Sequence, residues 1–256
     1  MKVLIQKVNN EFPNVNFYQA WQGFKELGFE IEFFRFNEKD AIGFFGVDHD
    51  QHVELDKETI IVGGVPVIDR AYQLLDITNP YLEDYPDILK PFLKRNVQKC
   101  MLKTIRSSVC CNDDPEWKGW FIKPVAKNRK QFNGHTVKKF SDLIITANRE
   151  ETEEVYCFDV INFTTEYRIF VHNNKFIHAS HYRGDTFQHI DRILIQDMIH
   201  AYAKDAPVSY ALDVGALGSG DTVLIEVNDS NAMGCYSLPP IKYANMISDR
   251  WWSIIK

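Results

Sequence analysis

Apolar and polar positions divide the first part of the chain into alternating strands and helices. Residues 1–5 and 30–36 have the pattern of strands, and the apolar spacing over 17–27 predicts a helix that ends at Gly28. Another strand, 59–62, leads into Gly63 and Gly64, and the spacing over 65–75 predicts a second helix. This β-α-β opening predicts a small α/β unit.

The pattern changes at residues 79–86, which are rich in turn residues and acids and form the best candidate linker. We therefore predict an N-terminal domain over 1–78 and a second domain over 79–256. In the second domain we expect a helix over 88–105 and then mostly strands. The expected strands are 119–125, 143–146, 155–163, 166–171, 175–182, 210–217 and 222–228, with helices at 190–202 and 240–255.

Composition indicates a globular chain, with 45% apolar residues among 256 and apolar runs far shorter than the roughly 20 residues of a membrane helix. The apolar N-terminus is followed by polar residues, so we interpret it as a buried strand and not as a signal peptide. Five cysteines, an odd number without metal-site spacing, predict reduced thiols and a cytoplasmic location.

The charge distribution points to a small anionic partner. A net charge of −6 argues against nucleic acid as a partner. A local basic patch stands out in this acidic chain. It consists of Lys118, Lys123, Lys127, Arg129, Lys130, Lys138 and Lys139.

Two carboxylates near the end of the sequence form the clearest candidate site. Residues 212–217 and 222–228 have the pattern of two strands joined by a hairpin. If Ser219 and Gly220 form a two-residue loop, Asp213 lies opposite Glu226, and alternation places Asn228 on the same face. Two like charges so close need a cation between them, and two carboxylates with an amide oxygen suit Mg²⁺.

The alternative for this hairpin is a solvated acidic face without a ligand. The apolar flanking residues favour buried strands, with Val223, Ile225 and Val227 on the core side. The polar loop 229–234 that follows favours a functional site, because function tends to lie on such loops.

Lys123 is the second candidate, because it interrupts the apolar strand 119–125 and an unpaired ammonium there would be costly. The basic loop 127–134 follows at once, so Lys123 and Lys130 are expected to converge on a phosphate. The alternative is an edge-strand lysine that extends into water. The chain contains no P-loop sequence and no clear dinucleotide fingerprint.

Glu166 and Arg168 share one face of the strand 166–171. They are either an ion pair of little energetic consequence, or Arg168 binds a phosphate or a substrate carboxylate through two hydrogen bonds. Arg183, at a strand end, is a weaker candidate of the same kind.

These motifs in this order resemble the ATP-grasp family: F-I-K-P, K-Q-F-N-G, E-Y-R-I-F-V, L-D-V-G and I-E-V-N. Lys123, Lys130 and Arg168 look like the signature of a phage and bacterial clade that is marked by one arginine and two lysines. The resemblance extends from about Lys90 to the C-terminus. It implies an α+β ATP-grasp fold, in which two α+β subdomains clasp ATP, preceded by a small Rossmann-like α/β domain.

The resemblance also implies roles for individual residues. The adenine would lie against the strand with Tyr156 and Phe158, with Asp159 in place of the usual ribose-binding glutamate, and Glu166 would also face the nucleotide. Lys123 and Lys130 would hold phosphate oxygens. The implied catalytic residues are Lys123, Lys130, Arg168 and Arg183. The implied ligands of two Mg²⁺ ions, for which Mn²⁺ could substitute, are Asp213, Glu226 and Asn228.

The implied activity is an ATP-dependent carboxylate-amine ligase that forms an amide through an acyl phosphate and releases ADP and phosphate. Its acceptors are an unknown carboxylate and amine, such as an amino acid, peptide or protein. Two alternatives stay open, a kinase-like phosphotransferase and a non-catalytic nucleotide sensor. The expected setting is a bacterial or phage-infected cytosol without a membrane partner, and a homodimer is a possible assembly.

Overall fold

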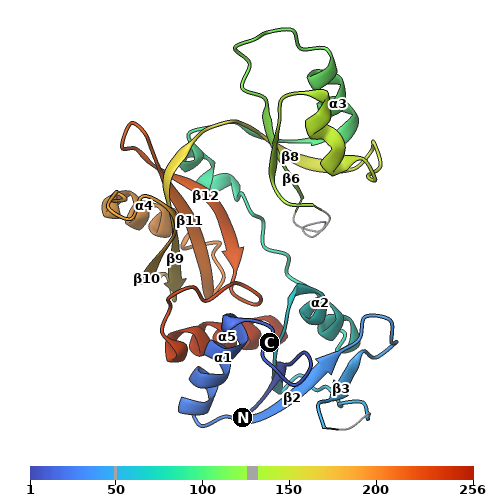
Figure 1. The fold of residues 1–256 in the computed structure, drawn as a ribbon. Helices are drawn as coiled ribbons and strands as arrows, with labels where there is room; N and C mark the ends of the chain where they lie inside the picture. The colour runs from blue at the N-terminus through green and yellow to red at the C-terminus, as the bar shows by residue number, and fades with distance from the viewer. Residues whose placement is uncertain (49–50, 126–131) are drawn as a thin grey trace.

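The computed structural model describes residues 1–48, 51–125 and 132–256, which form three four-stranded sheets (Figure 1). The first sheet has the order β3-β2-β1-β4. Its elements are β1 (Lys2–Gln6), α1 (Val15–Glu26), β2 (Glu30–Phe36), β3 (Phe44–Gly46), β4 (Thr59–Val62) and α2 (Val65–Leu74). As expected for a β-α-β unit, β1 is parallel to both β2 and β4, whereas the unpredicted β3 is antiparallel to β2.

A second sheet, of order β5-β8-β6-β7, is antiparallel and lies at the top of Figure 1. Its strands are β5 (Val97–Met101), β6 (Trp120–Pro124), β7 (His135–Val137) and β8 (Glu154–Asp159). Helix α3 (Leu102–Cys110) and the 3-10 helix η3 (Phe140–Thr146) contact each other and pack in one apolar cluster with one face of this sheet.

Three predictions for this region are wrong. Residues 88–105 are not one helix but the 3-10 helix η1 (Asp87–Leu93), β5 and the start of α3, because Pro91 lacks an N–H and Lys94 adopts a left-handed φ of 47°. Residues 143–146 lie in η3, whose start is fixed by the Asp142 carboxylate accepting from two backbone N–H groups. The predicted strand 155–163 divides after Asp159, and its last residue begins a strand of another sheet. The short β7 was not predicted.

The central sheet has the order β10-β9-β11-β12, and all its pairs are antiparallel. Its strands are β9 (Phe163–His172), β10 (Lys175–Gly184), β11 (Ser209–Leu217) and β12 (Thr222–Asp229). One face packs against α4 (Arg192–Tyr202) and η1 through an apolar cluster that includes Ile169, Leu212 and Leu224. The opposite face carries the polar residues of the candidate site. The sheet thus has an apolar face towards α4 and a polar face at the site.

The last helix, α5 (Pro240–Ile255), returns to the start of the chain and packs against α1 (Figure 1). Its residues Tyr243, Met246 and Trp251 belong to the same buried cluster as the strands of the first sheet. A division at residue 78 remains our proposal, and by this packing the N-terminal unit shares its core with the C-terminal helix. None of the helices within 1–48, 51–125 and 132–256 is long and apolar enough to cross a membrane.

The contact between α1 and α5 depends on Gly23. A Cβ atom at this position would lie 2.1 Å from the carbonyl oxygen of Pro240 and 2.8 Å from Cβ of Ala244. We expect Gly23→Ala to lower the free energy of unfolding by about 1–3 kcal/mol, because the two helices must move apart. Urea denaturation measures this, with Gly218→Ala as control, since a Cβ there meets nothing within 4 Å. Equal stability of the two variants would contradict the prediction.

Candidate functional site

The β11–β12 hairpin places Asp213 directly opposite Glu226, as the sequence predicted. The loop is longer than assumed, because the bond from the Leu217 N–H to the Asp221 carbonyl encloses three residues, and Gly220 has a φ of +89°. A β-bulge between Asp213 and Val214 then shifts the register by one residue. The longer loop and the bulge offset each other, and the predicted pair results.

The bulge changes which side chains of β12 face the core. Leu224 and Val227 belong to the apolar cluster under α4, whereas Val223 and the half-buried Ile225 do not. Val227 therefore lies on the predicted core side, whereas Val223, although fully buried, and Ile225 are not part of that cluster. An alternation pattern cannot reveal an extra residue in one strand, because the bulge reverses the alternation from that point on.

Basic side chains accompany both carboxylates. Arg168 in β9 lies opposite Asp213 and donates two hydrogen bonds of 2.7 Å to its carboxylate, and both side chains are buried. The Nζ atom of Lys123 in β6 lies 2.5 Å from Glu226 and 2.8 Å from Asp84. The positive charge that the facing pair requires is thus supplied by one cation for each carboxylate, so repulsion alone does not demand a metal ion.

The electrostatics follow from burial and from these partners. Burial by itself would lower the pKa of Lys123, but Glu226, Tyr85 and Asp84 raise it above the usual range. Burial raises the pKa of Asp213 in spite of the hydrogen bonds from Arg168. For Glu226 the attraction of Lys123 outweighs the effect of burial and lowers the pKa. Lys123 and Glu226 are therefore both charged at neutral pH.

Asn228 lies on the same face and joins the two carboxylates. Its Nδ2 atom donates to Asp213 and to Glu226, each at 3.2 Å. A rotation of the amide by half a turn would replace this donor with Oδ1, which gives three oxygen ligands around one point. Such a hard oxygen set fits Mg²⁺ held together with phosphate oxygens. Within the described residues, no group of three His, Cys, Asp or Glu side chains is placed to hold a metal ion by itself.

Glu166 and Arg168 lie on the same face of β9 but do not form an ion pair with each other. The Glu166 carboxylate accepts from the Tyr182 hydroxyl at 3.0 Å and pairs with Arg183 at 3.0 Å, whereas Arg168 is bonded to Asp213. The simple Glu166–Arg168 ion pair is therefore the wrong alternative. The side chain of Arg183 is 76% exposed at the rim of the site.

Lys123 belongs to a strand of the second sheet and reaches across to the central sheet. Its side chain is only 13% exposed, so the alternative of an edge-strand lysine in water is wrong. In the ladder it lies opposite Tyr156, and Phe121 lies opposite Phe158. The second predicted lysine, Lys130, lies outside the described residues.

Two of the residues predicted to bind adenine, Tyr156 and Phe158, lie on the face of β8 that packs in one cluster with the central sheet. Tyr156 and Phe158 are buried in one cluster with Tyr85, whose ring centroid lies 4.8 and 5.0 Å from theirs. The carboxylate of Asp159 accepts hydrogen bonds from the backbone and side chain of Asn96. Residues 160–162 connect the end of β8 to the start of β9 and so join the two sheets. The adenine site stays a prediction.

Sequence reasoning missed several residues of the site. Asp84 and Tyr85 come from the segment that was interpreted as a linker, and the Asp84 carbonyl accepts from the Val227 N–H, which fixes that segment at the edge of β12. The ring of Tyr236 lies 4.7 Å from the Arg168 guanidinium carbon. The acidic character of residues 79–86 was a usable signal, but nothing in the sequence connected it with Lys123.

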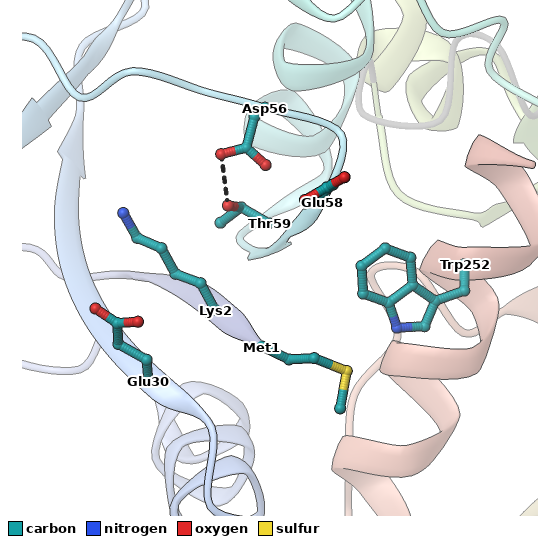
Figure 2. A pocket seen from close by; sticks show the side chains of 7 residues that line it. All are labelled: Met1, Lys2, Glu30, Asp56, Glu58, Thr59 and Trp252. Carbon is teal, nitrogen blue, oxygen red and sulfur yellow. Dashed lines mark hydrogen bonds between the residues drawn. The ribbon is translucent and has the colours of Figure 1, made fainter.

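Among the hollows lined by the N-terminal unit, two bear on the position of a ligand. One, of about 620 Å³, is at the amino ends of β1, β2 and β4 (Figure 2). Its carboxylates Glu30, Asp56 and Glu58 outnumber Lys2, whose ammonium pairs with Glu32 at 3.0 Å. An anionic nucleotide would be repelled there, and open α/β sheets bind ligands at the opposite, carboxyl ends of their strands.

The other hollow, of about 260 Å³, is at the carboxyl end of β4. Gly63 and Gly64 line it from the N-terminal unit, and Asn231 and Met233 line it from the loop after β12. No charged side chain is among the described residues that line it. It therefore adjoins both the first sheet and the strand that carries Glu226 and Asn228.

Residues 92–246 match the family model of the ATP-grasp domain, R2K clade family 2. The chain belongs to this ATP-grasp family. The match covers the second and central sheets and the first part of α5, including every residue proposed above for nucleotide and metal. The resemblance seen in the sequence and the predicted ATP-grasp fold, preceded by a small α/β unit, are thereby confirmed.

Solved structures share the fold of this ATP-grasp chain over nearly its whole length. D-cycloserine synthetase DcsG has a TM-score of 0.61 at 10% identity, over 98% of this chain and 100% of its own. D-alanyl-alanine synthetase A from Vibrio cholerae O1 biovar eltor str. N16961 has a TM-score of 0.61 at 13% identity, over 100% and 98%. D-alanine–D-alanine ligase from Bacillus anthracis has a TM-score of 0.58 at 13% identity, over 99% and 97%. Curated proteins gave no match to the ATP-grasp chain.

Proposed function

We propose that this protein is an ATP-dependent carboxylate-amine ligase that forms an amide bond through an acyl phosphate. The observation that carries the proposal is the contact of Lys123 with Glu226, which brings a strand lysine of one sheet to a carboxylate, an amide and Arg168 on the other. Membership of the ATP-grasp family and the ligases that share the fold support it.

In the proposed reaction the side chains of the two sheets bind and orient ATP between them. Lys123 and Lys130 hold phosphate oxygens, and Arg168 stabilises the charge that moves with the γ-phosphoryl group. Asp213, Glu226 and Asn228 would hold Mg²⁺, which offsets phosphate charge when bound. Transfer of the γ-phosphoryl group to a substrate carboxylate releases ADP, and attack of an amine on the acyl phosphate releases phosphate.

The acceptor is proposed to bind in the 260 Å³ hollow beside Gly63 and Asn231. The volume suits a small molecule or one residue of a peptide. Because the described lining has backbone and amide groups but no charge, it can bind the polar backbone of an amino acid or peptide without selecting a charged side chain.

Binding of Mg-ATP tests the nucleotide site. A ligand at one hundred times its Kd stabilises the folded protein by about 2.7 kcal/mol, so we expect Tm to rise by roughly 5–10 °C in a chain of this size. Lys123→Ala and Glu226→Ala should remove the shift, because each loses a proposed ligand of phosphate or metal. Lys90→Ala and Glu151→Ala, which lose exposed charges far from the site, should retain it.

Circular dichroism establishes that each variant is folded before its Tm shift is compared. A wild-type protein without a shift, or site variants that bind Mg-ATP as tightly as the wild type, would contradict the nucleotide site. The reaction itself is tested by ADP release with pooled amino acids, polyamines and peptides, followed by mass analysis. A product with a new amide bond supports the ligase. A phosphorylated product that is stable to hydroxylamine would instead show that the protein is a kinase.

A further inference from the structure

Arg95 lies at the junction of the second and central sheets. It follows the left-handed Lys94 and precedes β5, and its guanidinium carbon lies 4.5 Å from the ring centroid of Phe158 in β8 and 5.5 Å from that of Phe163 in β9. Its NH2 atom donates to the carbonyl of Ile225 in β12 at 3.4 Å, a long bond. One side chain therefore contacts a strand of the second sheet and two strands of the central sheet.

Ile225 lies at the bulge of β12, because Asp213 pairs with Glu226 and Val214 pairs with Leu224, so Ile225 has no partner residue in β11. The bond to its carbonyl holds the Arg95 guanidinium one residue before Glu226. Glu226 and Glu166 are among the groups that attract its charge.

Not every hydrogen-bond donor of the Arg95 side chain has an acceptor. Its Nε atom is buried and has no hydrogen-bond partner. Burial lowers the pKa of the guanidinium, although Tyr85, Glu226 and Asp159 counteract this. A buried donor without an acceptor is destabilising, so native proteins rarely keep one without a reason.

The other described cations of the site each have a carboxylate. Arg168 is bonded to Asp213, and Lys123 contacts Glu226 and Asp84. Arg183 pairs with Glu166. Arg95 forms no ion pair within 4.0 Å with any side chain in residues 1–48, 51–125 or 132–256. Among the described cations of the site, Arg95 is thus the one whose charge is left for a ligand.

We propose that Arg95 is a nucleotide-binding residue that donates to a phosphate oxygen of ATP from the junction of the two sheets. This inference rests on the proposed ATP site. A phosphate is the acceptor of choice, because a guanidinium presents donors in a planar fork that matches phosphate oxygens, and because the incoming nucleotide brings the negative charge that Arg95 lacks. The rings of Phe158 and Phe163, both within cation–π distance, hold the guanidinium at this position.

Equilibrium binding of ATP, ADP and adenosine to the full chain with Mg²⁺ tests the inference. We expect Arg95→Gln to weaken ATP and ADP about tenfold to a hundredfold and to leave adenosine within about twofold, because a charge-assisted bond to phosphate is lost. Arg95→Lys should recover part of the affinity for ATP. The matched control is Lys94→Gln, since the neighbouring Lys94 pairs with Asp221 at 2.8 Å and is 44% exposed.

The outcomes separate the two proposals. If the wild type binds no Mg-ATP, the proposed function fails together with this inference. If the wild type binds ATP and Arg95→Gln binds it equally well, the inference alone is overturned, and Arg95 serves only to connect the sheets. An equal loss of affinity for adenosine and ATP would also overturn it, because the contact would then be to the nucleoside. For a variant that does not fold, the comparison of Arg95→Lys with Lys94→Gln decides in the same way.

Discussion

Replacing Arg168 with methionine is expected to lower the free energy of unfolding by about 3–5 kcal/mol at neutral pH, because it leaves the buried Asp213 carboxylate without its partner. Arg168 is 7% exposed and Asp213 is 4% exposed, so water cannot replace the two lost hydrogen bonds. Urea denaturation at pH 7 measures the loss. The same variant should show no rise of Tm with Mg-ATP, since Arg168 is also a proposed ligand of the nucleotide.

The double variant Arg168→Met with Asp213→Asn is the control, and it should be more stable than Arg168→Met alone because no uncompensated charge remains. The pH dependence has a defined sign. Burial already raises the pKa of Asp213, and loss of Arg168 raises it further, so the penalty is present above that folded pKa and shrinks as the pH falls towards the unfolded pKa of about 3.9. A penalty that is the same at every pH, or that the double variant retains, would show that packing and not charge is responsible.

Trp251→Ala is expected to cost about 3–5 kcal/mol of unfolding free energy, as is typical when a large core side chain is truncated. Trp251 in α5 is 3% exposed, its ring centroid lies 5.8 Å from that of Tyr72 in α2, and its Nε1 donates to the carbonyl of Lys57 at 3.2 Å. The variant therefore creates a cavity between the C-terminal helix and the N-terminal unit. Chemical denaturation followed by circular dichroism measures the loss.

The adjacent Trp252 provides a matched control. It lies at the rim of the acidic hollow and is only half-buried (Figure 2), so Trp252→Ala should cost much less, about 1 kcal/mol. If both variants lose the same stability, the packing of α5 on the first sheet does not contribute as described. Two separate unfolding transitions in Trp251→Ala would show that the N-terminal unit and the ATP-grasp domain can unfold independently.

The elements of this fold could be predicted where a local pattern determines them. Strand alternation and the turn residues around Gly220 predicted the hairpin and the pairing of Asp213 with Glu226. The exact register was right because two differences cancelled: the loop is one residue longer than assumed, and a bulge in β12 shifts the register back by one residue. Residues 88–105 show the opposite case, since their apolar spacing suits a helix but Pro91 and the left-handed Lys94 divide them.

Contacts between distant segments were beyond prediction from the sequence alone. The hydrophobic pattern marks Lys123 as a buried charge that requires an anion, but it does not indicate that Glu226, 103 residues later, supplies one. Asp84 was placed in a linker, because acids next to prolines usually mark exposed turns. Arg95 carried no signal, since a single arginine within a predicted helix is ordinary, and only the packing of three strands around it reveals its missing partners.

The return of α5 to the first sheet has a consequence for how the protein is made. During synthesis the strands and helices of residues 1–78 leave the ribosome long before residue 240, at which α5 begins. At about 5–20 residues per second, roughly ten to thirty seconds pass before α5 follows. Over that time the apolar surface that Tyr243, Met246 and Trp251 later cover stays open to water. The nascent chain is thus expected to be prone to aggregation until α5 emerges.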